Sequence, residues 1–232
     1  MNGIILVDKP SGWTSFDICK KIRNLTREKK VGHGGTLDPF ATGLLLVFVG
    51  KAVKFSSNFS SGDKGYIGEM ALGVKTDTLD STGVITETKN DFKPFDEGQL
   101  KNAFNKYLGA IKQKPPMYSA IKINGKPLYK LARKGQEVER ELRDITIHQL
   151  EILGIDGNNI KFKVVCSKGT YIRSLADDIG NDLGCGAHLS SLQRFYSHPF
   201  LLSQALTIQT IENFSKIGEL EKIILPVEQF IF

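Results

Sequence analysis

The sequence predicts an α+β fold in which strands and helices follow one another irregularly within a single domain, residues 1–232. Strand and helix patterns occur in no fixed order and no βα period repeats, which argues against a doubly wound sheet. Apolar residues make up 41% of the 232 residues and charged residues 24%. That composition is typical of a globular chain able to bury a sizeable core. No internal repeat, low-complexity tract or linker divides the sequence.

Apolar runs bounded by turn-forming residues predict the strands. Residues 3–7 form the first run, and residues 44–50 are apolar almost throughout, which indicates a fully buried strand. Residues 144–153 and 160–166 flank the turn sequence Asp156-Gly157-Asn158-Asn159 and predict a hairpin. Further strands are expected at residues 66–74, 83–88, 119–123 and 189–196.

Helices are predicted from capping residues and apolar stripes. Thr14 and Asp17 are spaced as in a capping box and open the first helix. Its stripe contains Ile18, Cys19 and Ile22. Further helices are expected at residues 96–108, 128–134 and 170–183 and from about Thr207.

The positive charge of the chain is concentrated in one segment. The net charge is +6, yet residues 101–143 contain 11 Lys or Arg against three Glu, and the remaining residues contain 20 basic and 22 acidic side chains. A basic segment on a near-neutral body indicates a polyanionic partner such as a nucleic acid. A solvated lysine-rich surface explains the same charge equally well.

Several protein classes are excluded. The cysteines, Cys19, Cys166 and Cys185, are odd in number and far apart, which argues against a disulfide framework or a Cys-rich zinc site. The chain opens without a basic stretch followed by an apolar core and cleavage site. The longest apolar run, residues 44–49, is too short to span a bilayer. A cytoplasmic protein without a membrane anchor is expected.

The most unusual segment is GHGGTLDPFATG, residues 32–43, whose four glycines and single proline predict a loop. It is not a phosphate-binding loop, because no Gly-Lys-Ser/Thr follows the glycines. His33 and Asp38 are too few to bind a metal ion. On the residues alone, Asp38 before Pro39 is more typical of a turn than of a nucleophile.

Six segments, in order along nearly the whole chain, resemble the motifs of the TruB-type tRNA pseudouridine 55 synthases, relatives of dyskerin. The segments are VDKPSGWTS, VGHGGTLDPFATGLL, KGYIGEMALGVKTDTLDSTG, PPMYSAIKINGKPLYKLARKG, CSKGTYIRSLADDIG and GCGAHLSSLQR. The resemblance implies the pseudouridine synthase fold, a mixed, mostly antiparallel sheet flanked by helices and loops. It also implies an inserted basic thumb at about residues 115–143.

The implied reaction converts the uridine at position 55 in the T-loop of tRNA to pseudouridine. Asp38 matches the catalytic aspartate, which attacks either the sugar C1′ or the base C6 of a flipped-out uridine. Arg173 matches the arginine that pairs with this aspartate. Tyr66 matches the tyrosine that stacks on the target base and is also a candidate general base. The reaction is an isomerisation, so no cofactor and no metal is expected.

The resemblance also implies the residues that bind the RNA. Tyr171 and Leu192 match residues lining the uracil pocket, although both also fit core patterns. His33 matches a histidine that helps hold the RNA loop open. The thumb cations expected to meet phosphates are Lys122, Lys126, Lys130, Arg133, Lys134, Arg140 and Arg143.

Some features depart from the family pattern. Gly65 stands where the family usually has Arg, while Gly34 and Phe40 replace a usual Thr and Leu. The chain ends at Phe232, where bacterial members commonly continue into an RNA-binding PUA domain, so the expectation is either a naturally short form without that domain or a chain whose tail was cut. The protein is expected to act as a monomer on the T-arm of tRNA. An RNA-binding folding factor and a guide-dependent enzyme like dyskerin are the alternatives.

Overall fold

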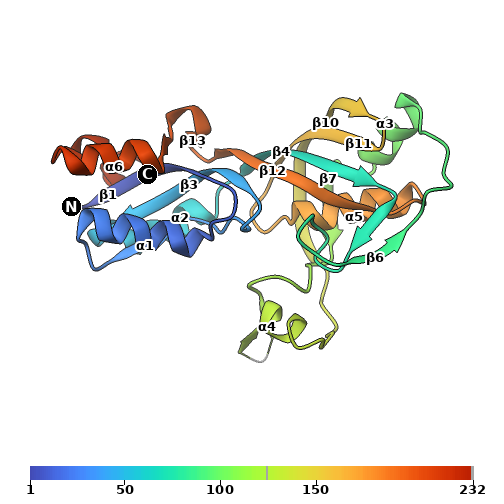
Figure 1. Cartoon of the computed structure of the whole chain (residues 1–232), viewed down its shortest axis with the longest axis horizontal. Coiled ribbons are helices and arrows are strands. Elements are labelled where there is room, and N and C mark those ends of the chain that lie inside the picture. The colour runs from blue at the N-terminus through green and yellow to red at the C-terminus, as the bar shows by residue number, and fades with distance from the viewer. Residues whose placement is uncertain (124, 231–232) are drawn as a thin grey trace. The chain divides into compact units, whose positions relative to one another are not determined.

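The computed structural model describes residues 1–123 and 125–230. These residues form two compact units, here called unit 1 (Met1–Ile67 with Leu192–Phe232) and unit 2 (Gly68–Ser191). The chain passes from one unit to the other within two strands, β4 (Lys64–Leu72) and β12 (Ala187–Ser197). Figure 1 shows the elements of both units.

The sheet of unit 1 is built on β1 (Gly3–Lys9) and β3 (Thr42–Val49), which run antiparallel. Both strands are apolar and completely buried over most of their length, as the unbroken apolar runs predict. The order of the strands is β14-β1-β3-β12. The remaining strands of this unit are β2 (Val31–His33), β13 (Phe200–Leu201) and β14 (Leu206–Thr207).

Two longer helices belong to unit 1, α1 (Ser15–Thr26) and α6 (Ile208–Lys216). The predicted capping box at Thr14 and Asp17 is confirmed, because each residue bonds the backbone N–H of the other. Thr207 caps α6 in a similar way. Shorter helical turns are η1 (Gly50–Phe55), α2 (Ser56–Ser60), η2 (Leu202–Gln204), η3 (Leu220–Ile223) and η4 (Val227–Phe230).

The main sheet of unit 2 has the order β4-β11-β10-β7. The predicted hairpin is confirmed as β10 (Arg143–Asp156) and β11 (Asn159–Cys166), paired antiparallel. The helices are α3 (Glu97–Asn105), α4 (Leu128–Ala132) and α5 (Ile172–Asp182). The remaining strands are β5 (Val74–Thr76), β6 (Ile85–Thr88), β7 (Gly109–Gln113), β8 (Lys122–Ile123) and β9 (Lys126–Pro127).

Several predicted boundaries are wrong for local reasons. The strand expected at residues 66–74 ends at Leu72, since Gly73 takes a left-handed φ of +85° and separates β4 from a second strand that begins at Val74. The helix expected to reach residue 108 ends at Asn105. Gly109, at φ +88°, then starts a strand instead of stopping a helix.

Three other predicted segments are shorter or displaced. The first two residues of the predicted glycine loop, 32 and 33, belong to β2 instead. The strand expected at residues 119–123 is confined to Lys122–Ile123. The helix expected at 128–134 ends at Ala132. None of the helices in the described part of the chain combines the length and apolar character needed to cross a membrane.

Candidate active site

The loop carrying Asp38 connects β2 to β3 in unit 1, and its backbone is held on both sides of that residue. The Ser15 hydroxyl donates to the Leu37 carbonyl (3.1 Å) and accepts from the Leu37 N–H (2.9 Å). The Gly12 N–H donates to the Pro39 carbonyl at 2.8 Å. The Ala41 N–H closes a turn on the Asp38 carbonyl at 3.1 Å. The start of α1 therefore fixes the backbone at which the Asp38 carboxylate is attached.

Lys9 is a buried cation beside this loop. Its side chain is fully buried, and its ammonium donates to the carbonyls of Pro10 (2.9 Å), Trp13 (2.7 Å) and Pro39 (3.2 Å). Burial lowers the pKa of Lys9 to about 8, although the negative charge of Asp38 acts in the opposite direction. Lys9 is therefore an electrostatic neighbour of Asp38 as well as a brace for the loop.

His33 lies in β2 opposite Val47 of β3. Burial, together with the positive charge of Arg194, lowers the pKa of His33 below its usual 6.5. The imidazole is therefore neutral at pH 7. Its Nδ1 atom is buried and has no hydrogen-bond partner among the described residues. The ring presents a planar, uncharged surface, which is the property required for contact with an unstacked base.

Tyr66 and Leu192 are both buried in unit 1, on β4 and β12. Beside them, the departure from the family pattern at Gly65 has a steric explanation. A Cβ atom at Gly65 would lie 2.6 Å from Cζ of the Phe195 ring. Phe195 on β12 occupies the space that a side chain at position 65 would need. This explains why glycine, and not the arginine usual in the family, stands at position 65.

Arg173 and Tyr171 lie at the start of α5 in unit 2, where Tyr171 is the N-cap residue. The Arg173 guanidinium donates to the carbonyls of Thr78 (2.9 Å) and Tyr118 (2.8 Å). It also forms an ion pair with Asp80, 3.3 Å between Nη1 and Oδ2, with both side chains 5% exposed. A buried pair with several hydrogen bonds holds the guanidinium in one orientation.

Asp80 was missed in the sequence, although its surroundings carry a signal. It lies in the run TDTLDSTG, residues 76–83, which is dense in short hydrogen-bonding side chains. Its Oδ1 atom accepts from Thr82 N (3.0 Å), Thr82 Oγ1 (2.6 Å) and Thr78 Oγ1 (2.8 Å). The loop thus presents one buried carboxylate oxygen to Arg173 and satisfies the other internally.

The segment predicted as the thumb, about residues 115–143, lies between β7 and β10 and ends on the first residue of β10, Arg143. Figure 1 shows α4 standing away from the sheet of unit 2. Leu128 is fully buried and forms its small core. Arg140 contacts Pro115 O at 3.1 Å and Glu137 at 3.1 Å, closing the base of the segment. The other predicted phosphate-binding cations are exposed: Lys122, Lys126, Lys130, Arg133, Lys134 and Arg143.

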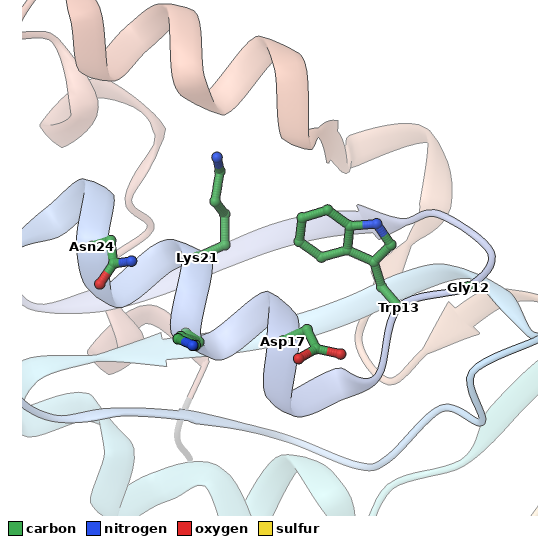
Figure 2. A pocket seen from close by; sticks show the side chains of 6 residues that line it. Gly12, Trp13, Asp17, Lys21 and Asn24 are labelled. Atoms are coloured by element: carbon green, nitrogen blue, oxygen red, sulfur yellow. The ribbon is translucent and has the colours of Figure 1, made fainter.

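An open hollow of about 340 Å³ lies along α1, lined by Gly12, Trp13, Asp17, Lys20, Lys21 and Asn24. Figure 2 shows the Trp13 indole at one end of it and the Lys21 side chain extending away from α1. Lys21 forms an ion pair with Glu212 of α6. Trp13 is the single tryptophan of the chain, and the Lys9 ammonium bonds both its carbonyl and that of Pro39.

The predicted site residues thus fall into two groups. Unit 1 contains His33 on β2, Asp38 in the loop before β3, Tyr66 on β4 and Leu192 on β12. Tyr171, Arg173 and the thumb cations belong to unit 2. Within unit 1 the structure adds Lys9 and Arg194 as buried cations that contact the Asp38 loop.

Comparison with known proteins identifies the class to which this fold and these motifs belong. Residues 23–172 match the model of the TruB family pseudouridylate synthase, N-terminal domain. Residues 173–231 match that of the tRNA pseudouridylate synthase B C-terminal domain. The chain therefore belongs to the TruB family of pseudouridylate synthases.

Individual relatives agree with this assignment. The chain is 44% identical to the tRNA pseudouridine synthase B of Opitutus terrae over 99% of its own length and 94% of the relative. It is 46% identical to the same-named protein of Stutzerimonas stutzeri, over 98% of its own length and 75% of the relative. Among solved structures, a chain of a Cbf5-Nop10-Gar1 complex is similar with a TM-score of 0.77 and 30% identity, over 99% of this chain and 61% of that one.

Proposed function

We propose that the protein isomerises the uridine at position 55 in the T-loop of tRNA to pseudouridine, acting as a monomer on the T-arm. The 44% identity to a tRNA pseudouridine synthase B, over almost the whole of both chains, is the observation that carries this proposal. The braced loop around Asp38 supports it, because covalent catalysis requires a carboxylate held in a fixed position.

Asp38 is the proposed nucleophile. Its carboxylate forms a bond to the flipped-out uridine, at C1′ with departure of the uracil N1, or at C6 of the ring. After the uracil has turned, a C5–C1′ bond replaces the original N1–C1′ bond and the bond to Asp38 breaks. The C5 hydrogen leaves as a proton and N1 gains one. Atoms and electrons balance without an oxidant, a reductant or a cofactor.

The other residues have supporting roles in this proposal. Arg173 serves the Asp38 carboxylate, keeping it ionised and oriented, and its rigid attachment to Asp80 suits this task. Tyr66 stacks on the target base, while Tyr171 and Leu192 surround the uracil. The neutral ring of His33 supports the RNA loop after the base has left the stack. The exposed thumb lysines and arginines contact phosphates.

The test uses purified protein and an unmodified tRNA transcript, with chemical mapping of pseudouridine and with no metal, cofactor or guide RNA added. We expect pseudouridine at position 55 and at no other uridine. An isolated T-arm hairpin is expected to react with a kcat/KM within about tenfold of that for whole tRNA, since the contacts that offset unstacking lie close to the flipped base.

Two variants make the test specific. Asp38→Ala is expected to abolish turnover and to leave tRNA binding intact, because it removes one carboxylate and few RNA contacts. Glu212→Gln is the matched control, since this carboxylate pairs with Lys21 on the surface of the same unit. Binding by the wild type without isomerisation would favour the RNA-binding factor instead. A requirement for guide RNA would favour a guide-dependent enzyme.

A further inference from the structure

The Arg194 side chain spans both ends of the Asp38 loop. Arg194 lies in β12 and its side chain is almost completely buried, with 1% exposed. Its Nε atom donates to the Leu44 carbonyl at 2.7 Å, and its Nη2 atom donates to the Gly35 carbonyl at 3.2 Å. Gly35 precedes Asp38 by three residues and Leu44 follows it by six. One planar, rigid group therefore fixes the distance between the two ends of the loop.

The backbone of the same residue also meets this loop. Arg194 pairs with Gly43 where β12 runs parallel to β3. Gly43 has a φ of +97°, and a Cβ atom there would lie 2.4 Å from the Arg194 carbonyl oxygen. Only glycine permits this approach. The main chain and the side chain of Arg194 thus hold the same end of the loop from two directions.

The charge of Arg194 has a high energetic cost in this position. Burying a guanidinium costs several kcal/mol unless partners satisfy its donors. Here carbonyls on the two sides of Asp38 accept from it, and its positive charge adds to burial, the larger cause, in lowering the pKa of His33 and of Lys9. An apolar side chain would fill the same volume at lower cost. Packing alone therefore does not explain a guanidinium at this position. The two carbonyls of the Asp38 loop, which need two donors at once, do explain it.

We propose that Arg194 is a positioning residue that holds the Asp38 loop in the geometry from which the carboxylate attacks. The role rests on the proposed function of Asp38. Arg194 does not touch the substrate; it acts through the Gly35 and Leu44 carbonyls. Its loss should therefore reduce the rate of the chemical step and leave RNA binding nearly unchanged, which separates it from a residue that contacts the RNA.

Arg194→Lys is the decisive variant. It keeps the positive charge, but a single ammonium cannot reach two carbonyls as the fork does. We expect kcat to fall about tenfold or more while KM for tRNA stays within about threefold. Arg194→Met, which also removes the charge, is expected to lose more kcat, so that Lys restores part of it. Phe200→Leu is the matched control, because it loosens the buried core of unit 1 where Phe200 packs against Phe59 and Phe230 and removes no hydrogen bond to the loop.

Thermal unfolding is recorded for each variant, and kcat is compared well below the lowest Tm. If Arg194→Lys does not fold, Gly35→Ala replaces it. At a φ of +112°, alanine is strained and turns the carbonyl that Arg194 binds, while Arg194 itself stays in place. The same selective loss of kcat is expected.

Three results would overturn the proposal. They are a kcat within about threefold of the wild type, a loss no larger than that of Phe200→Leu at equal Tm, and a rise in KM with unchanged kcat. The Asp38→Ala variant is assayed in parallel. If it retains turnover, the proposed function of Asp38 fails. If it is inactive while Arg194→Lys is fully active, only the positioning role fails.

Discussion

The side-chain amide of Gln113 forms two hydrogen bonds with the backbone of Tyr171. Its Oε1 atom accepts from the Tyr171 N–H at 2.8 Å, and its Nε2 atom donates to the Tyr171 carbonyl at 3.0 Å. Gln113 is buried at the end of β7, and Tyr171 is the N-cap of α5. The end of β7 therefore supplies an acceptor for the Tyr171 N–H and a second donor for the Tyr171 carbonyl, which also accepts from the Leu175 N–H at 3.1 Å. These bonds fix the backbone one residue before Ile172 and two before Arg173.

Replacing this amide by a side chain of similar size tests its structural value. Gln113→Leu removes both of these hydrogen bonds, but the Tyr171 carbonyl still accepts from the Leu175 N–H at 3.1 Å. The main loss is therefore the Gln113 partner of the Tyr171 N–H, and one buried group left unsatisfied costs about 1–3 kcal/mol. We expect the free energy of unfolding, measured with urea, to fall by about 1–3 kcal/mol. Gln149→Leu, on an exposed position of β10 in the same unit, is the control and should change it by less than about 0.5 kcal/mol. Equal effects at the two positions would show that the Gln113 bonds contribute nothing.

His33 should make the protein sensitive to acid. Its pKa is lowered in the folded state, so below about pH 6.5 the unfolded chain binds a proton that the folded chain does not. Stability is therefore lost as the pH falls from 7 toward the folded pKa. We expect wild type to lose more unfolding free energy between pH 7 and pH 5 than His33→Gln does. The other three histidines are common to both proteins. Parallel pH profiles would contradict the assignment.

Lys9 should titrate near pH 8, and Trp13 can report it. Below the Lys9 pKa of about 8, the ammonium donates to three carbonyls. Above it, the neutral amine has only two N–H groups, so one of the three carbonyls loses its donor. We expect a change in Trp13 fluorescence with a midpoint near pH 8, absent from Lys9→Met. The unfolded lysine keeps its proton to about pH 10.4, so the cost of burying this charge is relieved as the pH rises from 8 to that value. An emission that is constant from pH 7 to 9 would argue against the shift.

The thumb lysines should govern the salt dependence of RNA binding. Lys130 and Lys134 are exposed in a segment that carries most of the excess positive charge. Changing both to Gln should lower the slope of log Kd against log salt by about one to two, because each phosphate contact contributes roughly 0.7–0.9. The modified uridine should stay the same. Lys216→Gln with Lys222→Gln, exposed in unit 1, is the control. An unchanged slope for the thumb pair would place these lysines in solvent.

The features that the sequence predicted well are those decided by neighbours along the chain. The capping box at Thr14 and Asp17, the buried run of β3 and the hairpin around Gly157 depend on residues a few positions apart. Local propensity and apolar periodicity therefore suffice to predict them. Asp38 became a candidate only through the motif resemblance, since on its own residues it was more typical of a turn.

Two of the boundaries that were wrong lie at glycines whose conformation is not visible in the sequence. Gly73 divides what seemed one strand, and Gly109 begins β7 where it seemed to end a helix. Glycine adopts a positive φ equally readily at the end of a helix, in a turn or in a strand. Its presence therefore permits a break in the chain but does not predict which element follows. The pairing of β7 with β10 decides that outcome, and it joins residues that are distant in sequence.

The sequence by itself determined the family, the location of the nucleophile candidate and the basic character of the thumb, because motif and composition are carried by contiguous residues. Only the tertiary structure decided which groups hold the site residues in place. Arg194 reaches Leu44 across 150 positions, Asp80 binds Arg173, and Gln113 binds Tyr171 across 58. These are buried polar side chains, which are stable only when the fold brings a partner to them. No local sequence pattern predicts which group the partner will be, because strand pairing and packing bring the two together from segments far apart in the chain.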